Sequence, residues 1–439
     1  MFNGREVDDM RSKTKQLKAI SFFTGAGGLD LGFEAAGVDV RLAVDIMPES
    51  CLTLRYNAPE KIVIGPPSSS GDLYEITAPE ILDQSGLKKG EIDIVIGGPP
   101  CQPFSVAAAQ RFLKSDKKFK RKGFDCNEKG QLIFRYAELI ATLLPKAFLI
   151  ENVPGILSID GGSGIKIVYH MLTKAGYTLS EPFVLDAKDF GAPQNRRRAF
   201  VIGTLSGKKI TAPTPTHGSK QTFFTKEFTT VSQALFGMPE DLPNNEIRDH
   251  KESSLKRYKT LRYGEREPLG RVDRLDPLKP SKTVIAGGSG GGGRSHLHPY
   301  QARTMSVREC ARLQTFPDSY IFLGKNGRQF TQVGNAVPPL LAEVLARAIL
   351  EAEFGKTFQD RLVHSIEAPD PEQAAKSVLA QSKRDHSSLL YNDLAKQPMN
   401  QKFHSIHDSI ANRSGYGQRT MCPPRQGFST PKNRVPTRP

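Results

Sequence analysis

Residues 18–30, KAISFFTGAGGLD, join a short apolar stretch to a glycine-rich turn and then to a helical pattern. Lys18–Phe23 has the composition of a buried β-strand, and Gly25, Gly27 and Gly28 follow it at once. A glycine turn between a strand and a helix lets backbone amides approach a ligand at the helix N-terminus. The stretch therefore predicts the first strand–turn–helix unit of a nucleotide-binding α/β fold.

Strand and helix patterns continue to alternate as far as Gly203. Apolar residues recur at helical spacing over 132–143. Such alternation is typical of βαβ units around a mostly parallel sheet. We therefore predict an α/β fold, a doubly wound Rossmann-like sheet, in a first domain at 17–203. Short apolar runs predict its other strands at 38–44, 92–96, 147–150 and 199–202.

The chain beyond this domain is less regular. A glycine run occupies 287–293, and helical patterns return over 306–313 and 338–350. The last part is rich in Gln, Ser, Asn and Pro and ends in a basic stretch, as in disordered segments. The predicted parts are a second, smaller, irregular domain at 204–330, a helix returning to the first domain at 331–356, and a basic disordered tail at 357–439.

The composition narrows the classes of partner. Of 439 residues, 61 are Lys or Arg and 46 are Asp or Glu, which gives a net charge of +15 and favours a polyanion such as nucleic acid. A run of about 18 uninterrupted apolar residues is missing, and the N-terminus has no apolar signal core, so we expect a soluble protein without a membrane partner.

The five cysteines are odd in number and widely scattered, which excludes a disulfide framework and a CxxC zinc pair. The residue types of His296, His298 and Cys310 are ones that can bind zinc. A lone HxH without a nearby cysteine pair is a weak zinc signal, however, and we predict no metal site.

The second predicted strand ends at Asp45, 20 residues after Gly25. In folds of this kind a carboxylate there accepts hydrogen bonds from both ribose hydroxyls, which predicts a nucleoside cofactor. No Walker lysine follows the glycine turn, so ATP is disfavoured, while NAD and S-adenosylmethionine both remain open. Asp72, beyond the next strand, is either a contact to an adenine ring or a turn residue.

A cysteine follows another predicted strand in residues 92–105, IDIVIGGPPCQPFS. The Pro-Pro turn presents Cys101 at the carboxyl edge of the sheet, where open α/β folds bind ligands. Buried structural cysteines usually lie within apolar runs, so we interpret Cys101 as a nucleophile. The next segment can bind phosphates, since its cations are Arg111, Lys114, Lys117, Lys118, Lys120, Arg121 and Lys122.

Two further motifs lie near strand ends. Glu151 follows the apolar run 147–150, where burial can make a carboxyl hold or deliver a proton at neutral pH. An incidental strand-end glutamate is a comparable interpretation. Alternation along a strand places Gln194, Arg196 and Arg198 on one face, as donors for a base carbonyl, a phosphate or a carboxylate.

Together these motifs resemble the cytosine-C5 DNA methyltransferases across residues 17–353. The nucleophile loop is similar at 98–105, the acid motif at 151–153 and the arginine motif at 194–198. Residues 274–283 and 308–318 resemble the motif that organises the recognition domain, and 332–339 resemble the last motif, whose helix completes the cofactor pocket.

The resemblance implies S-adenosylmethionine as cofactor and duplex DNA as substrate, with the target cytosine flipped out of the stack. Cys101 would add to C6, Glu151 would hydrogen-bond or protonate N3, and Arg196 and Arg198 would hold the cytosine carbonyl and the glutamate. The implied cofactor residues are Phe23, Gly25, Gly27, Gly28, Asp45, Ile46, Asp72, Leu73, Pro99, Asn335 and Ala336. The implied DNA contacts are Gln102, Ser105, Arg111, Lys117, Lys118, Lys120, Arg121, Gln194, Thr283, Arg294 and His296.

The resemblance has departures and alternatives. Asn127–Leu132 lacks the acidic-Arg-Leu pattern that often follows the catalytic loop, and the variable segment 204–272 is short, so we expect a short recognition site. The resemblance also implies a bacterial restriction-modification enzyme that is cytoplasmic and monomeric, with an endonuclease as its genetic partner. A eukaryotic member of the family would be nuclear. An RNA cytosine methyltransferase and a non-catalytic DNA-binding relative stay open, and a nicotinamide oxidoreductase leaves the Pro-Pro-Cys turn unexplained.

Overall fold

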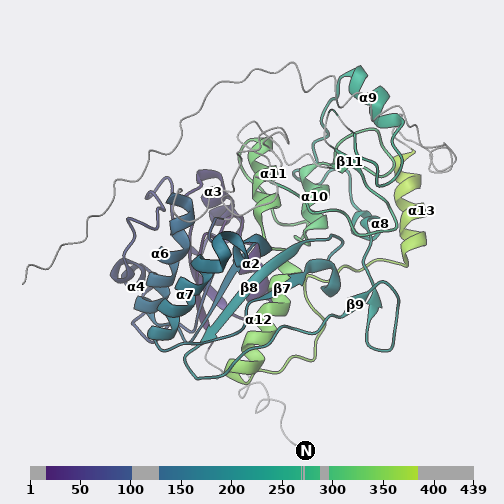
Figure 1. Ribbon diagram of the computed structural model, residues 1–439. Coiled ribbons are helices and arrows are strands. Elements are labelled where there is room, and N and C mark those ends of the chain that lie inside the picture. Colours follow the sequence, from purple (N-terminus) through teal and green to yellow (C-terminus); the bar gives the residue numbers. More distant parts are fainter. Residues whose placement is uncertain (1–15, 101–127, 268, 270–271, 287–295, 384–439) are drawn as a thin grey trace, which may run out of the picture. The chain divides into compact units, whose positions relative to one another are not determined.

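The computed structural model describes residues 16–100, 128–267, 269, 272–286 and 296–383, which all fall within one compact unit. Its centre is an eight-stranded sheet in the order β3-β2-β1-β4-β5-β8-β6, with β7 paired to β8 (Figure 1). β8 runs antiparallel to its neighbours, whereas the first five strands are parallel. The bounds are β1 Lys18–Phe22, β2 Asp39–Val44, β3 Ile62–Ile64, β4 Ile94–Gly97, β5 Ala147–Asn152, β6 Thr178–Leu179, β7 Phe183–Asp186 and β8 Arg197–Thr204.

In the central strands β1, β4, β5 and β8, alternate residues enter two different apolar clusters. In β4, Val95 packs into one cluster, and Ile94 and Ile96 pack into the other. Helices α4 (Ala78–Ser85), α6 (Glu128–Leu143) and α7 (Ser163–Lys174) cover the first face, and α2 (Gly28–Ala35) and α12 (Pro339–Phe354) cover the second. The predicted doubly wound α/β sheet is confirmed.

The strand order fixes where a ligand can bind. β1 lies between β2 and β4, so the chain winds away from β1 in both directions. Open α/β sheets bind ligands outside the carboxyl ends of the strands at such a reversal. The turns that follow β1 and β4 both lie at this edge, and α3 (Pro48–Asn57) follows β2 beside them.

The second region has little regular structure. Its strands form two pairs of two residues each, β9 (His217–Gly218) with β10 (Lys226–Glu227) and β11 (Asp273–Arg274) with β12 (His296–Leu297). One apolar cluster joins it to the glycine turn, because Ala26 packs with residues of its helices. These helices are α8 (Val231–Leu235), α10 (Val307–Leu313) and α11 (Asn326–Asn335), whereas α9 (Glu252–Lys259) packs in a separate small cluster.

The expectation of a wholly disordered tail at 357–439 is wrong for its first part. Helix α13 (Pro371–Ser382) begins at Asp370, whose carboxylate accepts hydrogen bonds from two backbone amides of the first turn. Ala374 and Val378 are buried, and Val378 packs in the same cluster as α8. The polar composition hid this helix because only one narrow face is apolar. Residues 384–439 lie outside the described part.

One stretch, Asn326–Phe354, which combines α11 and α12, is long and apolar enough to cross a membrane. However, 78% of its apolar window is buried inside the protein, and α12 packs directly on α2. In this fold the stretch is a core helix.

Candidate active site

The glycine turn after β1 is held in a conformation that other residues adopt with difficulty. Phe23 has φ 52°, which ends the strand one residue before the predicted bound, and Gly25 and Gly27 also have positive φ. A Cβ at Gly28 would lie 2.2 Å from the carbonyl oxygen of Val337, so only glycine permits this contact. The turn before α12 therefore lies against the start of α2.

Asp45 lies at the end of β2 and fixes the glycine turn from the other side. Its Oδ2 accepts a hydrogen bond from the Gly25 amide at 2.7 Å, and its Oδ1 accepts one from the Met47 amide at 2.8 Å. Burial raises the pKa of Asp45 to about 6, although both amides act to lower it. A Cβ at Gly25 would meet nothing within 4 Å, so the turn is open on the side where that Cβ would lie. Ile46, the next predicted cofactor residue, is exposed.

The turns after β4 and β5 meet at the same edge, because the two strands pair in parallel with Gly97 opposite Ile150. Glu151 occupies the space that a side chain at Gly98 would fill, since a Cβ there would lie 2.7 Å from Glu151 Oε2. Asn152 donates from Nδ2 to the carbonyl oxygen of Pro99 at 3.1 Å. These contacts fix the Gly98–Pro100 turn against Glu151. Residues 101–127, with Cys101, Gln102, Ser105 and the predicted cations, lie outside the described residues.

Arg198 forms an ion pair with Glu151, with Nε 2.8 Å from Oε1. Burial raises the pKa of Glu151, and Arg198 and Arg196 only partly offset this effect. A buried carboxyl with a raised pKa can hold a proton closer to neutral pH than an exposed one. The end of β5 therefore carries a candidate acid beside the turn that leads to Cys101.

Two of the three residues in the predicted arginine motif have other partners. Arg196 is fully buried, and its guanidinium donates to the carbonyl oxygens of Val284, Gly334 and Asn335. Gln194 is fully buried as well and bonds to Leu313, Gln314 and Val284. The structure contradicts the prediction that Gln194 contacts DNA and that Arg196 holds the cytosine carbonyl, since groups inside the fold occupy both side chains. The predicted action of Arg196 on the glutamate is left as its electrostatic effect on Glu151.

Burial also corrects two other predicted contacts. His296 is 2% exposed and hydrogen-bonds through Nε2 to the carbonyl oxygen of Lys282, so it cannot face DNA. Leu73 packs in the core and leaves no side-chain surface for a cofactor. Thr283 is half-buried and donates to the carbonyl oxygen of Asn195. Arg294 lies outside the described residues.

The remaining predicted cofactor residues keep accessible or boundary positions. Asp72 is half-buried and accepts a hydrogen bond from the Tyr74 amide, as a turn residue does. Asn335, the last residue of α11, is exposed, and Ala336 lies beside Gly28. Within the described ranges, no group of three or more His, Cys, Asp or Glu side chains could hold a metal ion.

Sequence reasoning missed several residues that build this edge. The Tyr320 hydroxyl donates to the carbonyl oxygen of Ala26 at 2.8 Å and anchors the glycine turn from 294 residues away. Asn152 could have been found, because it follows directly on Glu151 at the end of a strand parallel to β4. Gln314 could not, since its partners are distant in sequence. Cys51 and Cys310 are buried with raised pKa values, so neither is an activated thiol.

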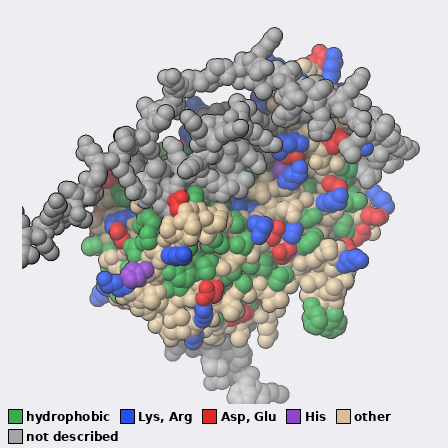
Figure 2. Space-filling model, viewed as in Figure 1, with side chains coloured by type: hydrophobic (Ala, Val, Ile, Leu, Met, Phe, Trp, Pro, Cys, Tyr) green, Lys and Arg blue, Asp and Glu red, His purple; other side chains and the backbone are tan. Residues whose placement is uncertain are grey.

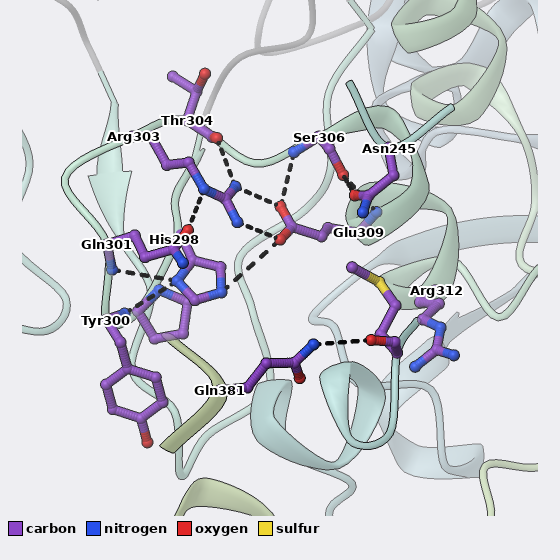
Figure 3. A network of polar contacts seen from close by, with 12 residues as sticks. Asn245, His298, Tyr300, Gln301, Arg303, Thr304, Ser306, Glu309, Arg312 and Gln381 are labelled. Atoms are coloured by element: carbon purple, nitrogen blue, oxygen red, sulfur yellow. Dashed lines mark hydrogen bonds and ion pairs between the residues drawn. The ribbon is translucent and has the colours of Figure 1, made fainter. Parts of the chain in front are cut away.

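A buried ionic network supports the second region (Figure 3). Both nitrogens of the Arg303 fork reach Glu309, at 2.9 and 2.7 Å, and the Ser306 amide also donates to this carboxylate. Burial raises the pKa of Glu309, but Arg303, His298 and the Ser306 amide outweigh it and bring the pKa to about 2. His298 is buried too, and its pKa falls to about 3. The network therefore consists of a fixed ion pair and a neutral imidazole.

The excess of positive charge is unevenly spread along the chain. Lys and Arg exceed Asp and Glu by five in residues 101–127 and by six in residues 384–439, out of a total of +15. On the face shown in Figure 2, Lys and Arg side chains of the described part are interspersed with Asp and Glu. Most of the net positive charge that could attract a polyanion therefore lies in those two segments.

A model of the C-5 cytosine-specific DNA methylases matches residues 17–351. The chain belongs to this family. Relatives include the Type II methyltransferase M1.HphI of Haemophilus parahaemolyticus, which is 33% identical over 76% of this chain and 87% of its own length. M.NgoFVII of Neisseria gonorrhoeae, also a Type II methyltransferase, is 31% identical over 79% and 90%.

A solved structure from an Escherichia coli prophage, described as a candidate DNA modification methyltransferase, is 26% identical. It superposes with a TM-score of 0.61 over 78% of this chain and 100% of its own. These findings confirm the predicted family and fold class and the prediction of a DNA cytosine methyltransferase.

Proposed function

We propose that the enzyme transfers a methyl group from S-adenosylmethionine to C5 of a cytosine within a short sequence of duplex DNA. The observation that carries this proposal is the contact of Glu151 with both Arg198 and the Gly98–Pro100 turn. It brings an acid with a raised pKa to Gly98, three residues before Cys101.

The edge beside Asp45 fits the cofactor. Its carboxylate oxygens each retain capacity to accept from a ribose hydroxyl, and the open space at Gly25 gives room for a ligand backbone to approach. Exposed Ile46 offers an apolar surface for an adenine ring. We assign Phe23, Asp72, Pro99, Asn335 and Ala336 to the rim of this pocket. When bound, S-adenosylmethionine supplies an electrophilic methyl group on its sulfonium.

Cys101 and Glu151 activate the ring in this proposal. C5 of cytosine is a poor nucleophile, so the Cys101 thiolate adds to C6 while Glu151 gives a proton to N3, and C5 becomes electron-rich. After methylation, N3 returns its proton to Glu151, a base removes the C5 proton, and cleavage of the bond from sulfur to C6 releases the Cys101 thiolate. Arg198 holds the Glu151 carboxyl in position and can donate to the cytosine carbonyl.

The DNA contacts are assigned to residues around the catalytic loop. Arg111, Lys117, Lys118, Lys120 and Arg121 are expected on phosphates, which predicts a strong salt dependence of binding. Neutralising the last four should flatten the plot of log affinity against log salt, and an unchanged slope would remove the loop from the phosphate backbone. Gln102, Ser105, Thr283 and Arg294 are assigned to the flipped base and its flanks.

Methyl transfer from labelled S-adenosylmethionine to duplex DNA tests the function. The wild type should label DNA, and Cys101→Ser should lose nearly all incorporation. Competition with tRNA as acceptor distinguishes an RNA methyltransferase, and a chain that binds DNA without transfer would be the non-catalytic relative. Bisulfite sequencing of DNA from expressing cells would reveal the recognised site.

The relatives named as Type II methyltransferases support a wider context. We propose a monomeric cytoplasmic enzyme of a bacterial restriction-modification system, with the cognate endonuclease as a genetic partner. The endonuclease should then cut the DNA of a host that lacks the enzyme, and expression of the enzyme should protect that DNA.

A further inference from the structure

Three fully buried side chains meet where the sheet, the second region and α11 join: Gln194, Arg196 and Gln314. We refer to them as the amide junction. Their hydrogen bonds to Val284, to Leu313 and to residues 333–336 lie inside the fold, and the proposed chemistry does not explain why three large polar side chains are buried here.

The two glutamines are bonded to each other and to both sides of the junction. Gln194 donates from Nε2 to Gln314 Oε1 at 2.6 Å and to the Leu313 carbonyl at 2.8 Å, and its Oε1 accepts from the Val284 amide at 3.2 Å. Gln314 donates from its own Nε2 to the carbonyls of Val333 at 2.6 Å and Ala336 at 3.3 Å. Both side-chain amides use donor and acceptor atoms.

Arg196 completes the set on the same helix end. It donates to the Gly334 carbonyl at 3.0 Å and to the Asn335 carbonyl at 3.2 Å, and it also reaches the Val284 carbonyl at 3.0 Å. The junction therefore donates hydrogen bonds to four consecutive carbonyl oxygens, those of residues 333 to 336. These are the last carbonyls of α11, which a helix cannot satisfy internally.

The sequence after α11 makes this dependence stronger. The residues four positions after Gly334 and Asn335 are Pro338 and Pro339, which have no amide hydrogen to donate. The Leu340 amide, four positions after Ala336, donates instead to Thr315 Oγ1. The positive charge of Arg196 also suits a helix C-terminus. Without the junction, the turn that carries Asn335 and Ala336 has few internal bonds to hold its shape.

We propose that Gln314 is a positioning residue: it holds the Asn335–Ala336 turn in the shape that binds the nucleoside cofactor, and through Gln194 it ties that shape to the segment around Val284. The inference rests on the proposed use of S-adenosylmethionine. It predicts that cofactor affinity depends on a side chain that does not touch the cofactor, and that binding of DNA and of cofactor is coupled through this residue.

Calorimetric titration with S-adenosylhomocysteine tests the proposal without turnover. Gln314→Met preserves the volume but removes both donated hydrogen bonds, and we expect it to weaken binding about tenfold. Gln332→Met is the matched control, because Gln332 is also buried on α11 but donates to the Leu323 carbonyl, away from the turn. It should lower the melting temperature and leave the affinity unchanged.

A second variant guards against a folding defect. Gln314→Glu keeps an acceptor for Gln194 but cannot donate to Val333 or Ala336, so it should also weaken binding and should abolish the effect of a DNA duplex on cofactor affinity. Equal affinities of the folded Gln314 variants and the wild type would overturn the inference, as would equal losses in the Gln332 control. A wild-type protein that binds no S-adenosylhomocysteine would instead overturn the proposed function.

Discussion

The sheet and the second region are stabilised in different ways. In the sheet, strands satisfy their own backbone groups, and the side chains that fill the interior are apolar, such as Ile20, Phe148 and Leu149. In the second region, irregular segments leave backbone carbonyls without backbone partners, and buried arginine side chains donate hydrogen bonds to these carbonyls. Arg308 reaches three such carbonyls and Arg274 reaches four.

The difference shows what irregular structure requires. A buried carbonyl without a partner costs about 1 to 3 kcal/mol, so a region with few strands and helices needs side-chain donors in its core. The guanidinium suits this role because it offers five hydrogens in a planar array. The two regions should therefore respond differently to substitution.

The largest effect is expected for Arg303→Met in the second region. This change leaves Glu309 buried without its ion-pair partner, which should reduce the free energy of unfolding by about 3 to 5 kcal/mol at pH 7. Burial would then raise the pKa of Glu309 above its usual range, so the loss should shrink as the pH falls toward 4. Urea unfolding at several pH values measures this, and a loss independent of pH would contradict the ionic explanation.

In the sheet, Leu149→Ala should reduce the free energy of unfolding by about 2 to 5 kcal/mol, through lost apolar burial and a cavity. Because no charge is involved, this loss should be the same at pH 4 and pH 7. A pH-dependent loss in urea unfolding would contradict the proposed difference between the two regions.

An intermediate effect concerns Asp45, the polar group at the sheet edge. Its pKa of about 6 means that the carboxylate, the better acceptor for ribose hydroxyls, is lost as the pH falls. Binding of S-adenosylhomocysteine should therefore be about tenfold weaker at pH 5 than at pH 8. Without ligand the sign is opposite, since a raised pKa favours the folded protein as the pH falls through 6. Asp45→Asn should remove the pH dependence of binding.

The smallest effect is expected in the loop that joins the parallel strands β9 and β10. Phe223 is 95% exposed, and its ring contact is with Phe224, which is also exposed. Phe223→Ser should change the free energy of unfolding by less than about 0.5 kcal/mol. A larger loss in thermal unfolding would show that this loop has a structural role in the second region.

The sequence predicted the sheet better than the rest for a physical reason. Long apolar strands such as β1 and β5 carry a local pattern, and their bounds differ from prediction by one or two residues. β3, β6 and β7 are short, so they carry too little pattern. Gln194 and His296 were assigned to DNA by motif, but their polar partners lie inside the fold and depend on contacts distant in sequence.

The same limit applied to the candidate site. The end of β5 identified Glu151, and alternation along β8 identified Arg198, because both signals are local. The role of Arg196 could not be predicted, since the carbonyls it satisfies come from residues 284, 334 and 335. Helix α13 was missed because polar residues surround its narrow apolar face.

Covalent trapping tests the central claim most directly. An oligonucleotide duplex with 5-fluorocytosine at the target position is incubated with enzyme and S-adenosylmethionine. Fluorine cannot leave C5 in the way that a proton does. We expect a stable adduct, located by mass spectrometry on the peptide with Cys101 and absent in Cys101→Ser. Bound DNA with no adduct, or an adduct on another residue, would contradict the central claim.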